Sequence, residues 1–419
     1  MKVLVVGSGG REHTILWKLK KDNEKIELHV APGNGGMEAI ATCHPVSAED
    51  VPNLVKLAKK LEVELVVVGP EVPLAMGIVD ELEKEGIKAF GPNKSCARLE
   101  ASKAFTKDFL ARHNIPTAGY KEYTDKETIL KDVGIYGYPM VIKADGLAAG
   151  KGVVIAETKE ESESAINQMM GDKIFGSAGD TIVVEEFLTG IEASMLCFVD
   201  ENTIVPMESA QDYKRIFDGD KGPNTGGMGT YSPSLIFNDE LKETIKNEIL
   251  EPTLQGFRKD GLKFKGVLFI GLMIKNNKAK VIEFNNRFGD PETQSVLPRL
   301  QTNLLDIFRA VTENKLSEID IKWSEECAIC VVLASEGYPG NYEKGRVING
   351  LENVGDDILI FHSGTKKTDD RFVNAGGRVL GVTAIGKTHQ EAREKVFKNV
   401  DEIEFEGMQY RKDIGLLNE

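Results

Sequence analysis

Residues 278–297 read KAKVIEFNNRFGDPETQSVL, and we expect the fold to be organised around this stretch. Its first half alternates as a strand does, so Glu283 and Asn285 share one face, while Ile282 and Phe284 enter a core. The two polar residues are two positions apart, roughly 6.5 to 7 Å along a strand. Carboxylate and amide oxygens at this separation suit magnesium ions held between the strand and a polyphosphate. The pattern predicts the floor of a site, and a polar edge strand leading into a solvated turn is the alternative.

Length and composition define the class of protein. A chain of 419 residues predicts two to four domains, and 41% hydrophobic with 28% charged residues is typical of a soluble globular protein. The net charge of −14 argues against nucleic-acid or membrane binding but allows small anionic substrates. The sequence lacks a signal peptide and any apolar run near 18 residues, so we expect a cytoplasmic protein. Cys327 and Cys330 are expected to be buried strand thiols, and the six histidines lack metal-site spacing.

The N-terminal region predicts a doubly wound parallel sheet, because strand-like segments alternate with helix-length segments up to about residue 100. It opens with KVLVVGSGGREHTILWKL, in which a glycine turn leads into a helix whose first NH groups can hold a phosphate. Gly7 and Gly9 fit the dinucleotide fingerprint, but Glu12 stands where the third glycine belongs. A turn needed only for tight strand-to-helix packing is the alternative. The turns at residues 31–36 and 69–71 are further candidate substrate contacts.

Two lysines follow in a region of different character. Ser102 is expected to cap a helix that ends before Pro116, which leaves Lys103 in the first turn, either solvated or holding an anion. The segment YPMVIKADGLAAGKGVVIAET predicts two strands joined by a glycine loop, with Lys143 projecting beside that loop. The loop can fold over phosphates, or it can be an ordinary solvated hairpin, and it is not the P-loop of NTPases. Farther on, the strand that breaks at EEFL exposes backbone groups for an adenine edge.

The strand lysine, the glycine loop, the EEFL segment and the late polar strand together resemble the ATP-grasp superfamily. In that superfamily ATP lies between two α+β lobes and activates a carboxylate as an acyl phosphate. The segments GSGGREH, KADGLAAGKGV, AQDYKRIFDGDKGPNTGGMGTYSP and NRFGDPETQ resemble, more narrowly, the family of phosphoribosylamine–glycine ligases. This resemblance implies that ATP, glycine and 5-phosphoribosylamine give ADP, phosphate and glycinamide ribonucleotide through a glycyl phosphate, in purine biosynthesis.

The resemblance also implies roles for individual residues. Catalytic residues would be Asp212 and Arg287, and the metal ligands Glu283 and Asn285. ATP would be bound by Lys103, Lys143, Gly150, Lys151, Glu185, Leu188 and Glu192. The other substrates would be bound by Gly9, Gly10, Glu71, Asp212, Lys214, Arg287 and Asp290, under a lid formed by residues 223–227.

Two of these roles have alternatives in the sequence itself. Arg287 could instead form a structural ion pair with Asp290 or Glu292. The strand before Glu283 offers Gly271, Leu272 and Met273 where many superfamily members carry an acid, so we expect one magnesium ion, with manganese as the alternative.

We therefore predict a multidomain protein of mixed α/β and α+β class. Its parts would be an N-terminal open parallel sheet (1–101), ATP-grasp lobes (102–324, the smaller at about 123–190) and a small C-terminal α+β domain (325–419). The partners implied are the three small-molecule substrates and a transient contact with the preceding enzyme of the pathway, with no nucleic acid and no membrane. Alternatives are another ATP-grasp ligase, a nicotinamide dehydrogenase that uses GSGG, and a nucleotide-binding regulator.

Overall fold

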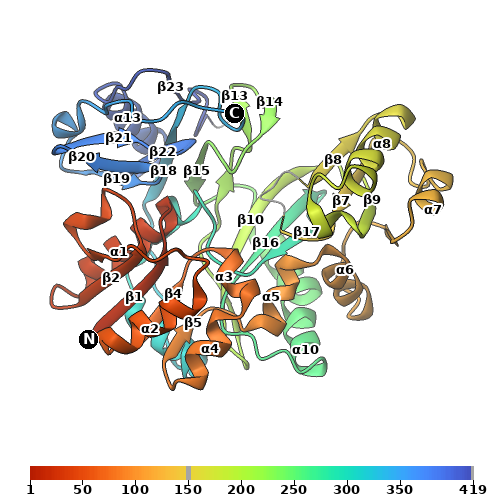
Figure 1. Cartoon of the computed structure of the whole chain (residues 1–419), viewed down its shortest axis with the longest axis horizontal. Helices are drawn as coiled ribbons and strands as arrows, with labels where there is room; N and C mark the ends of the chain where they lie inside the picture. The colour runs from red at the N-terminus through yellow and green to blue at the C-terminus, as the bar shows by residue number, and fades with distance from the viewer. Residues whose placement is uncertain (148–151, 417–419) are drawn as a thin grey trace.

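The computed structural model describes residues 1–147 and 152–416 and is drawn in Figure 1. A central sheet lies in the middle of the view, with the N-terminal and C-terminal sheets on one side of it. The smaller lobe, which carries β7 and β9, projects on the opposite side (Figure 1). The mixed α/β architecture predicted from the sequence is confirmed.

The N-terminal sheet is parallel, with the strand order β3-β2-β1-β4-β5. Its strands are β1 Lys2–Gly7, β2 Glu27–Pro32, β3 Thr42–Cys43, β4 Leu65–Val68 and β5 Lys88–Phe90. Its helical segments are α1 Gly10–Asp22, η1 Met37–Ala39, α2 Val51–Leu61, α3 Glu71–Met76, α4 Ile78–Lys84 and α5 Lys94–Ala101. β1 and β4 are buried along almost their whole length, as expected for parallel strands covered on both faces. The short edge strand β3 was not among the strands that the sequence indicated, whereas β5 begins the segment KAFGPNK that it did indicate.

The smaller lobe is an antiparallel sheet with the order β6-β9-β7-β8. Its strands are β6 Tyr120–Tyr123, β7 Met140–Ala144, β8 Val153–Ala156 and β9 Ile182–Glu186. Its helical segments are α7 Lys126–Lys131, α8 Lys159–Ile166, η2 Asn167–Gly171 and η3 Gly176–Gly179. The predicted pair of strands around the glycine loop is confirmed as β7 and β8. Gly150 and Lys151, which we predicted to bind ATP, lie outside the described residues.

The central sheet has the order β11-β10-β16-β17. Its strands are β10 Ile191–Val199, β11 Ile204–Pro206, β16 Gly266–Lys275 and β17 Lys278–Asn285. Buried side chains of α6 Lys103–Arg112, α9 Asp239–Ile245, η4 Lys246–Leu250 and α10 Glu251–Lys259 pack against this sheet. Ser102 caps α6 as predicted, because its Oγ accepts the backbone N–H of Phe105 at 3.1 Å.

A β-bulge in β17 corrects the predicted alternation of this strand. Glu283 pairs with Gly271 and Val281 pairs with Leu272, so Ile282 is an extra residue between them. The bulge shifts the pattern by one residue, and Val281 joins Phe284 in the core while Ile282 is only half-buried. The prediction that Ile282 enters the core was therefore wrong.

The C-terminal sheet has the order β12-β15-β18-β22-β19, and β23 pairs with β18. It includes two short strands from the central part of the chain, β12 Gln211–Asp212 and β15 Gly229–Ser232. The other strands are β18 Cys327–Ser335, β19 Ile358–His362, β22 Arg378–Gly386 and β23 Met408–Gln409. Two hairpins stand apart, β13 Arg215–Phe217 with β14 Lys221–Asn224, and β20 Thr365–Thr368 with β21 Arg371–Asn374. The remaining helical segments are α11 Thr293–Val296, η5 Leu297–Arg299, α12 Leu304–Thr312, η6 Leu316–Glu318, η7 Leu351–Asn353 and α13 His389–Val400.

One hydrophobic core joins the N-terminal and central sheets. It contains side chains from β1, from α1 and α12, and from β10 and β16. Because this core fixes β1 relative to β10 and β16, loops from distant parts of the chain meet at one place.

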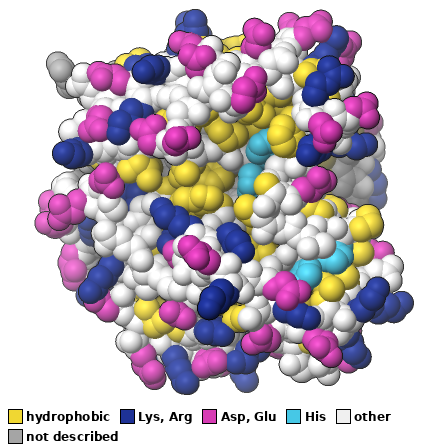
Figure 2. Space-filling view, turned by 90° about the vertical axis from the view of Figure 1, so that its left-hand side faces the viewer, with side chains coloured by type: hydrophobic (Ala, Val, Ile, Leu, Met, Phe, Trp, Pro, Cys, Tyr) yellow, Lys and Arg dark blue, Asp and Glu magenta, His cyan; other side chains and the backbone are white. Residues whose placement is uncertain are grey.

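The distribution of charge on the surface and the apolar character of the helices are relevant to which partners the protein can bind. On the face drawn in Figure 2, Lys and Arg side chains are mixed with Asp and Glu, and hydrophobic side chains gather near the middle. Among the described residues, every helix is too short or too polar to span a membrane.

Candidate active site

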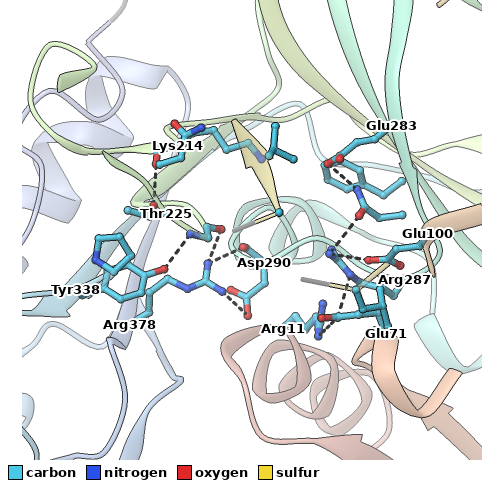
Figure 3. Close-up of a pocket in the computed structure, with 18 of the residues that line it drawn as sticks. Arg11, Glu71, Glu100, Lys214, Thr225, Glu283, Arg287, Asp290, Tyr338 and Arg378 are labelled. Carbon is cyan, nitrogen blue, oxygen red and sulfur yellow. Dashed lines mark hydrogen bonds and ion pairs between the residues drawn. The ribbon is translucent and has the colours of Figure 1, made fainter. Parts of the chain in front are cut away.

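A cavity of about 990 Å³ lies where the four sheets approach one another. The N-terminal segment contributes Arg11 and Glu71, and the central strand β17 contributes Glu283. The C-terminal segment contributes Tyr338 and Arg378. Figure 3 shows these side chains converging on the cavity from opposite walls. The cavity is large enough for a nucleotide and small substrates together.

The end of β17 presents the two predicted metal ligands side by side. Asn285 Nδ2 donates to Glu283 Oε1 at 3.3 Å, and both side chains line the cavity. Burial would raise the pKa of Glu283, but Lys143, Lys103 and Lys214 lower it, so this carboxylate stays ionised. Gly271 leaves room for it, because a Cβ at that position would lie 3.3 Å from Glu283 Cγ. The described residues contain no group of three His, Cys, Asp or Glu side chains arranged for a metal, so phosphate oxygens and water would complete the coordination of an ion held by Glu283 and Asn285.

Lys143 is part of a buried cluster that the sequence did not reveal. Its Nζ lies 2.9 Å from Glu185 Oε1, and the other oxygen of this carboxylate lies 2.8 Å from Lys107 Nζ. Lys107 also donates to Thr117 Oγ1 at 2.8 Å. Burial lowers the pKa of Lys107 to about 8, although Glu185 opposes this shift. Glu185, predicted to contact adenine, is therefore held between two ammonium groups.

The other predicted ATP ligands border the same region. Lys103, at the start of α6, lines the cavity and donates to the carbonyl oxygens of Gly146 and Glu100, at 3.2 and 3.3 Å. Leu188 lies in the connection between β9 and β10, and Glu192 is the second residue of β10, with an exposed side chain. Their roles in binding ATP stay predictions.

Arg287 contacts acids other than those that we expected. Its Nη2 lies 3.1 Å from Glu100 Oε1, and its Nε lies 3.5 Å from Glu71 Oε2. Arg11 approaches the same Glu71 oxygen at 3.5 Å. The two arginines lower the pKa of Glu71 against the effect of burial. The suggested ion pair of Arg287 with Asp290 or Glu292 is replaced by this network, which forms one wall of the cavity (Figure 3).

The glycine turn after β1 is occupied by the chain's own carboxylate. Gly9 N–H donates to Glu12 Oε2 at 2.6 Å, and Glu12 Oε1 accepts from Arg11 Nε at 2.5 Å. A Cβ at Gly69 would collide with this carboxylate, so the glycine makes room for Glu12. Gly9 and Gly10 are absent from the described residues that line the cavity, whereas Arg11 lines it. Their predicted phosphate contact stays a prediction, and the tight packing at Glu12 matches the alternative that we considered.

Lys214 lines the opposite wall, whereas its partner Asp212 is absent from the described residues that line the cavity. Lys214 Nζ lies 2.7 Å from Asp212 Oδ2, and the Asp212 side chain is buried. Burial would lower the pKa of Lys214, but Asp212, Glu292 and Glu192 raise it. Glu292 is also buried, and burial together with Asp212 raises its pKa to about 7.

The segment predicted as a lid is tied to the C-terminal sheet. Gly226 N–H donates to the Tyr338 hydroxyl at 2.9 Å, and Arg378 Nη1 donates to the Gly226 carbonyl at 2.8 Å. Arg378 also donates to the Asp290 carbonyl at 2.6 Å, and its Nη2 lies 3.4 Å from Asp290 Oδ2. Asp290, a predicted substrate contact, is thus held by the same arginine that contacts Gly226 of the segment predicted as a lid, as Figure 3 shows.

Sequence reasoning missed several residues of the site, namely Arg11, Glu100, Lys107, Glu292, Tyr338 and Arg378. Lys107 lies one helical turn after Lys103, and this i, i+4 spacing was a signal that could have found it. Tyr338 and Arg378 carry no local signal, because they reach the cavity from a separate sheet. The expectation for Cys327 and Cys330 is confirmed, since both are buried in β18.

Comparison with known proteins gives consistent matches along the chain. Models of the phosphoribosylglycinamide synthetase N domain, ATP-grasp (A) domain and C domain match residues 1–100, 101–293 and 328–417. A phosphoribosylamine–glycine ligase from Halalkalibacterium halodurans is 48% identical over 416 residues, which cover 99% of this chain and 96% of the relative.

Two solved structures extend the comparison. The crystal structure of phosphoribosylamine–glycine ligase from Thermotoga maritima has a TM-score of 0.88 and 33% identity, covering 99% of this chain and 100% of that one. The biotin carboxylase domain of Hydrogenobacter thermophilus 2-oxoglutarate carboxylase, solved with MgADP and bicarbonate, has a TM-score of 0.74. At 16% identity, covering 98% of this chain and 91% of that one, it shares the fold alone.

Proposed function

We propose that the cavity binds ATP, glycine and 5-phosphoribosylamine through the side chains described above. The reason is that this chain belongs to the phosphoribosylglycinamide synthetase family. The chain is an ATP-dependent ligase that joins glycine to 5-phosphoribosylamine in purine biosynthesis. Enzymes with this ATP-grasp domain use ATP together with a divalent metal ion. The roles of single residues, the identity of the ion and the glycyl phosphate are our proposals.

Lys103 and Lys143 are assigned to the phosphates of ATP. Lys103 lines the cavity, and both lysines lower the pKa of the Glu283 carboxylate. Because the Glu185 carboxylate is engaged by Lys107 and Lys143, we assign adenine to the backbone near Leu188. Glu192, exposed at the start of β10, is assigned to the ribose hydroxyls.

Glu283 and Asn285 fit a magnesium ion, with manganese as the alternative. Both offer hard oxygen atoms, and the ionised Glu283 supplies negative charge at the cavity wall. When bound, such an ion would offset the charge of the polyphosphate and of the attacking carboxylate.

The chemistry begins with two anions that must meet. The carboxylate of glycine attacks the γ-phosphorus of ATP, the bond to ADP breaks, and glycyl phosphate forms. Lys103, Lys143 and Arg287 offset the repulsion between the two reactants. The amine of phosphoribosylamine then attacks the acyl carbon, and a C–N bond replaces the bond to phosphate as one amine proton leaves.

The intermediate must be protected from water until the amine arrives. The segment at Thr225 and Gly226 is connected to Tyr338 and Arg378, so it is suited to cover the cavity. Glu71 keeps its charge between two arginines and is assigned to the ribose hydroxyls of phosphoribosylamine.

This assignment rests on Lys103 and Glu283, which line one cavity, and on Lys143, which lies close enough to lower the pKa of Glu283 together with Lys103. The test supplies ATP, magnesium, glycine and freshly generated phosphoribosylamine and follows ADP. We expect full ADP release to need both glycine and phosphoribosylamine. ADP release that ignores either substrate would refute the ligase assignment, and turnover with another amino acid in place of glycine would favour a different ATP-grasp ligase.

A further inference from the structure

The hairpin β13–β14 is bounded on both sides by residues of the cavity wall. Lys214 directly precedes β13, and Asn224 ends β14 directly before Thr225. All three residues line the cavity. Thr225 donates to the Lys214 carbonyl through its backbone N–H and through its Oγ1, each at 2.8 Å (Figure 3). The position of the hairpin therefore determines where these cavity residues lie.

Arg411 is buried at the base of this hairpin, although it lies 196 residues after Arg215. Its side chain is 1% exposed, and its Nη1 donates to the Arg215 carbonyl at 3.0 Å and to Asp220 Oδ1 at 2.8 Å. Its Nε and Nη2 donate to the two oxygens of Asp413, at 2.8 and 2.6 Å. The guanidinium also lies 4.8 Å from the centroid of the Tyr213 ring. One side chain thus joins both ends of the hairpin to the segment 411–415.

The segment 411–415 also holds the turn of the hairpin. Asp218 Oδ1 accepts the backbone N–H of Lys412 at 2.8 Å. In the opposite direction, Asp413 Oδ2 accepts the backbone N–H of Gly219 at 2.8 Å. These two hydrogen bonds run across the exposed tip of the hairpin, so the base and the tip are fixed to the same segment.

The far side of this segment is attached to helix α13. Arg393 donates to the carbonyl oxygens of Lys412 and Ile414, at 2.6 and 3.1 Å. Buried side chains of α13 pack in the core of the C-terminal sheet, which also contains Ile414. The segment therefore sets the hairpin relative to that sheet. Arg411 is absent from the described residues that line the cavity, so it can affect the reaction only through the hairpin.

We propose that Arg411 is a positioning residue for the reaction, because it fixes the hairpin β13–β14 and so holds Lys214 and Thr225 at the cavity wall. This inference rests on the proposed function, because it needs the segment at Thr225 to cover the intermediate. Without the guanidinium, the hairpin loses three hydrogen-bond acceptors at its base at once. Lys214 and Thr225 would then move from the wall, and water would reach glycyl phosphate.

The first test replaces Arg411 by methionine, which keeps a long apolar side chain and removes the fork of donors. We expect kcat for glycinamide ribonucleotide to fall roughly 10- to 100-fold, because a small misplacement of reacting groups has an effect of this size. The ratio of ADP to glycinamide ribonucleotide should rise above one. The KM for ATP should change by less than about twofold, because ATP is assigned to Lys103 and Lys143 on other elements.

Two further variants separate positioning from general stability. Arg411→Lys keeps a cation over the Tyr213 ring but lacks the fork, so its kcat and its product ratio should lie between those of the wild type and Arg411→Met. Asp218→Ala removes only the hydrogen bond at the exposed tip, so the fold should be kept. We expect its kcat to fall about two- to tenfold, with a product ratio above one.

Arg112→Met is the matched control. Arg112 also pairs with two carboxylates, Asp108 at 2.7 Å and Asp260 at 2.8 Å, and it is absent from the described residues that line the cavity. Its kcat, its product ratio and its KM for ATP should equal those of the wild type.

All assays are made below the unfolding transition of each variant, which thermal unfolding measures. A lower melting temperature of Arg411→Met with an unchanged kcat and a ratio of one would make Arg411 merely structural and overturn the proposal. A KM for ATP that rises as much as kcat falls would also overturn it, because the whole cavity would then be disturbed. If Arg411→Met does not fold, Asp218→Ala decides, since wild-type values in that variant would refute the positioning role. ADP release by the wild type that ignores glycine would instead contradict the proposed function itself.

Discussion

Replacing Lys107 by methionine should weaken ATP binding, although Lys107 does not line the cavity. In the wild-type structure the Glu185 carboxylate lies 2.8 Å from Lys107 and 2.9 Å from Lys143. If Lys143 turns to the phosphates of ATP, as we propose, Lys107 remains as the counter-ion of Glu185. In Lys107→Met the carboxylate has Lys143 as its counter-ion, so ATP and Glu185 compete for one ammonium group.

The size of the effect follows from that competition. A hydrogen bond to a charged group contributes roughly 1.5 to 3 kcal/mol. If ATP must replace this bond, its KM should rise roughly 10- to 100-fold, with a smaller change in kcat. Burial lowers the pKa of Lys107 to about 8, so the ammonium loses its proton above that pH. The wild-type KM for ATP should therefore rise above pH 8 or so, and Lys107→Met should lack this rise.

Steady-state kinetics at several pH values measure both expectations. Lys107→Arg keeps the charge and should restore most of the affinity for ATP. Lys121→Met is the matched control, because Lys121 pairs with Asp132 at an exposed site of the same lobe. Equal KM values for ATP in the wild type and in Lys107→Met would refute the reasoning, since a merely structural lysine would change the melting temperature and leave this constant alone.

Three further changes test other parts of the molecule. Glu283→Ala should abolish ADP formation while the unfolding transition is kept, and near-normal activity would remove Glu283 from the metal site. Arg378→Ala removes the hydrogen bond to the Gly226 carbonyl, which we expect to help hold the proposed lid over the cavity. Glycyl phosphate should then be lost to water, so the ratio of ADP to glycinamide ribonucleotide should rise above one. A ratio of one would contradict the role of this segment as a lid. His13 accepts the backbone N–H of His362 at 2.8 Å, and burial lowers the pKa values of these rings to about 3 and about 4. Both pKa values lie below the unfolded value of about 6.5, so the free energy of unfolding should decrease as the pH falls through about 6.5. The expected loss is about 2 kcal/mol per ring at pH 5. Urea unfolding of the wild type and of His13→Gln at several pH values measures this loss.

Local features of the site could be read from the sequence because they depend on near neighbours. The cap at Ser102 places Lys103 at the start of α6, and strand alternation places Lys143 beside the glycine loop. Glu283 and Asn285 reach the cavity together, as their spacing predicted. Backbone geometry alone fixes such relations over a few residues.

The bulge at Ile282 required the partner strand, because a bulge is defined by pairing and not by one strand. The counter-ions of Arg287 also needed the fold. Glu71 and Glu100 are distant from it in sequence, and they outcompete the nearby acids because packing brings them to one wall.

The sequence by itself determined the ATP-grasp character of this protein and the end of β17, where residues 278–297 place a carboxylate and an amide before a bend. Only the tertiary structure decided which charges surround them. Lys107, Glu292 and Arg378 come from elements whose spacing shows no shared pattern, and they meet because the hydrophobic cores fix the sheets relative to one another. Electrostatic interactions act across space and depend on burial, so their partners and their pKa values are set by packing.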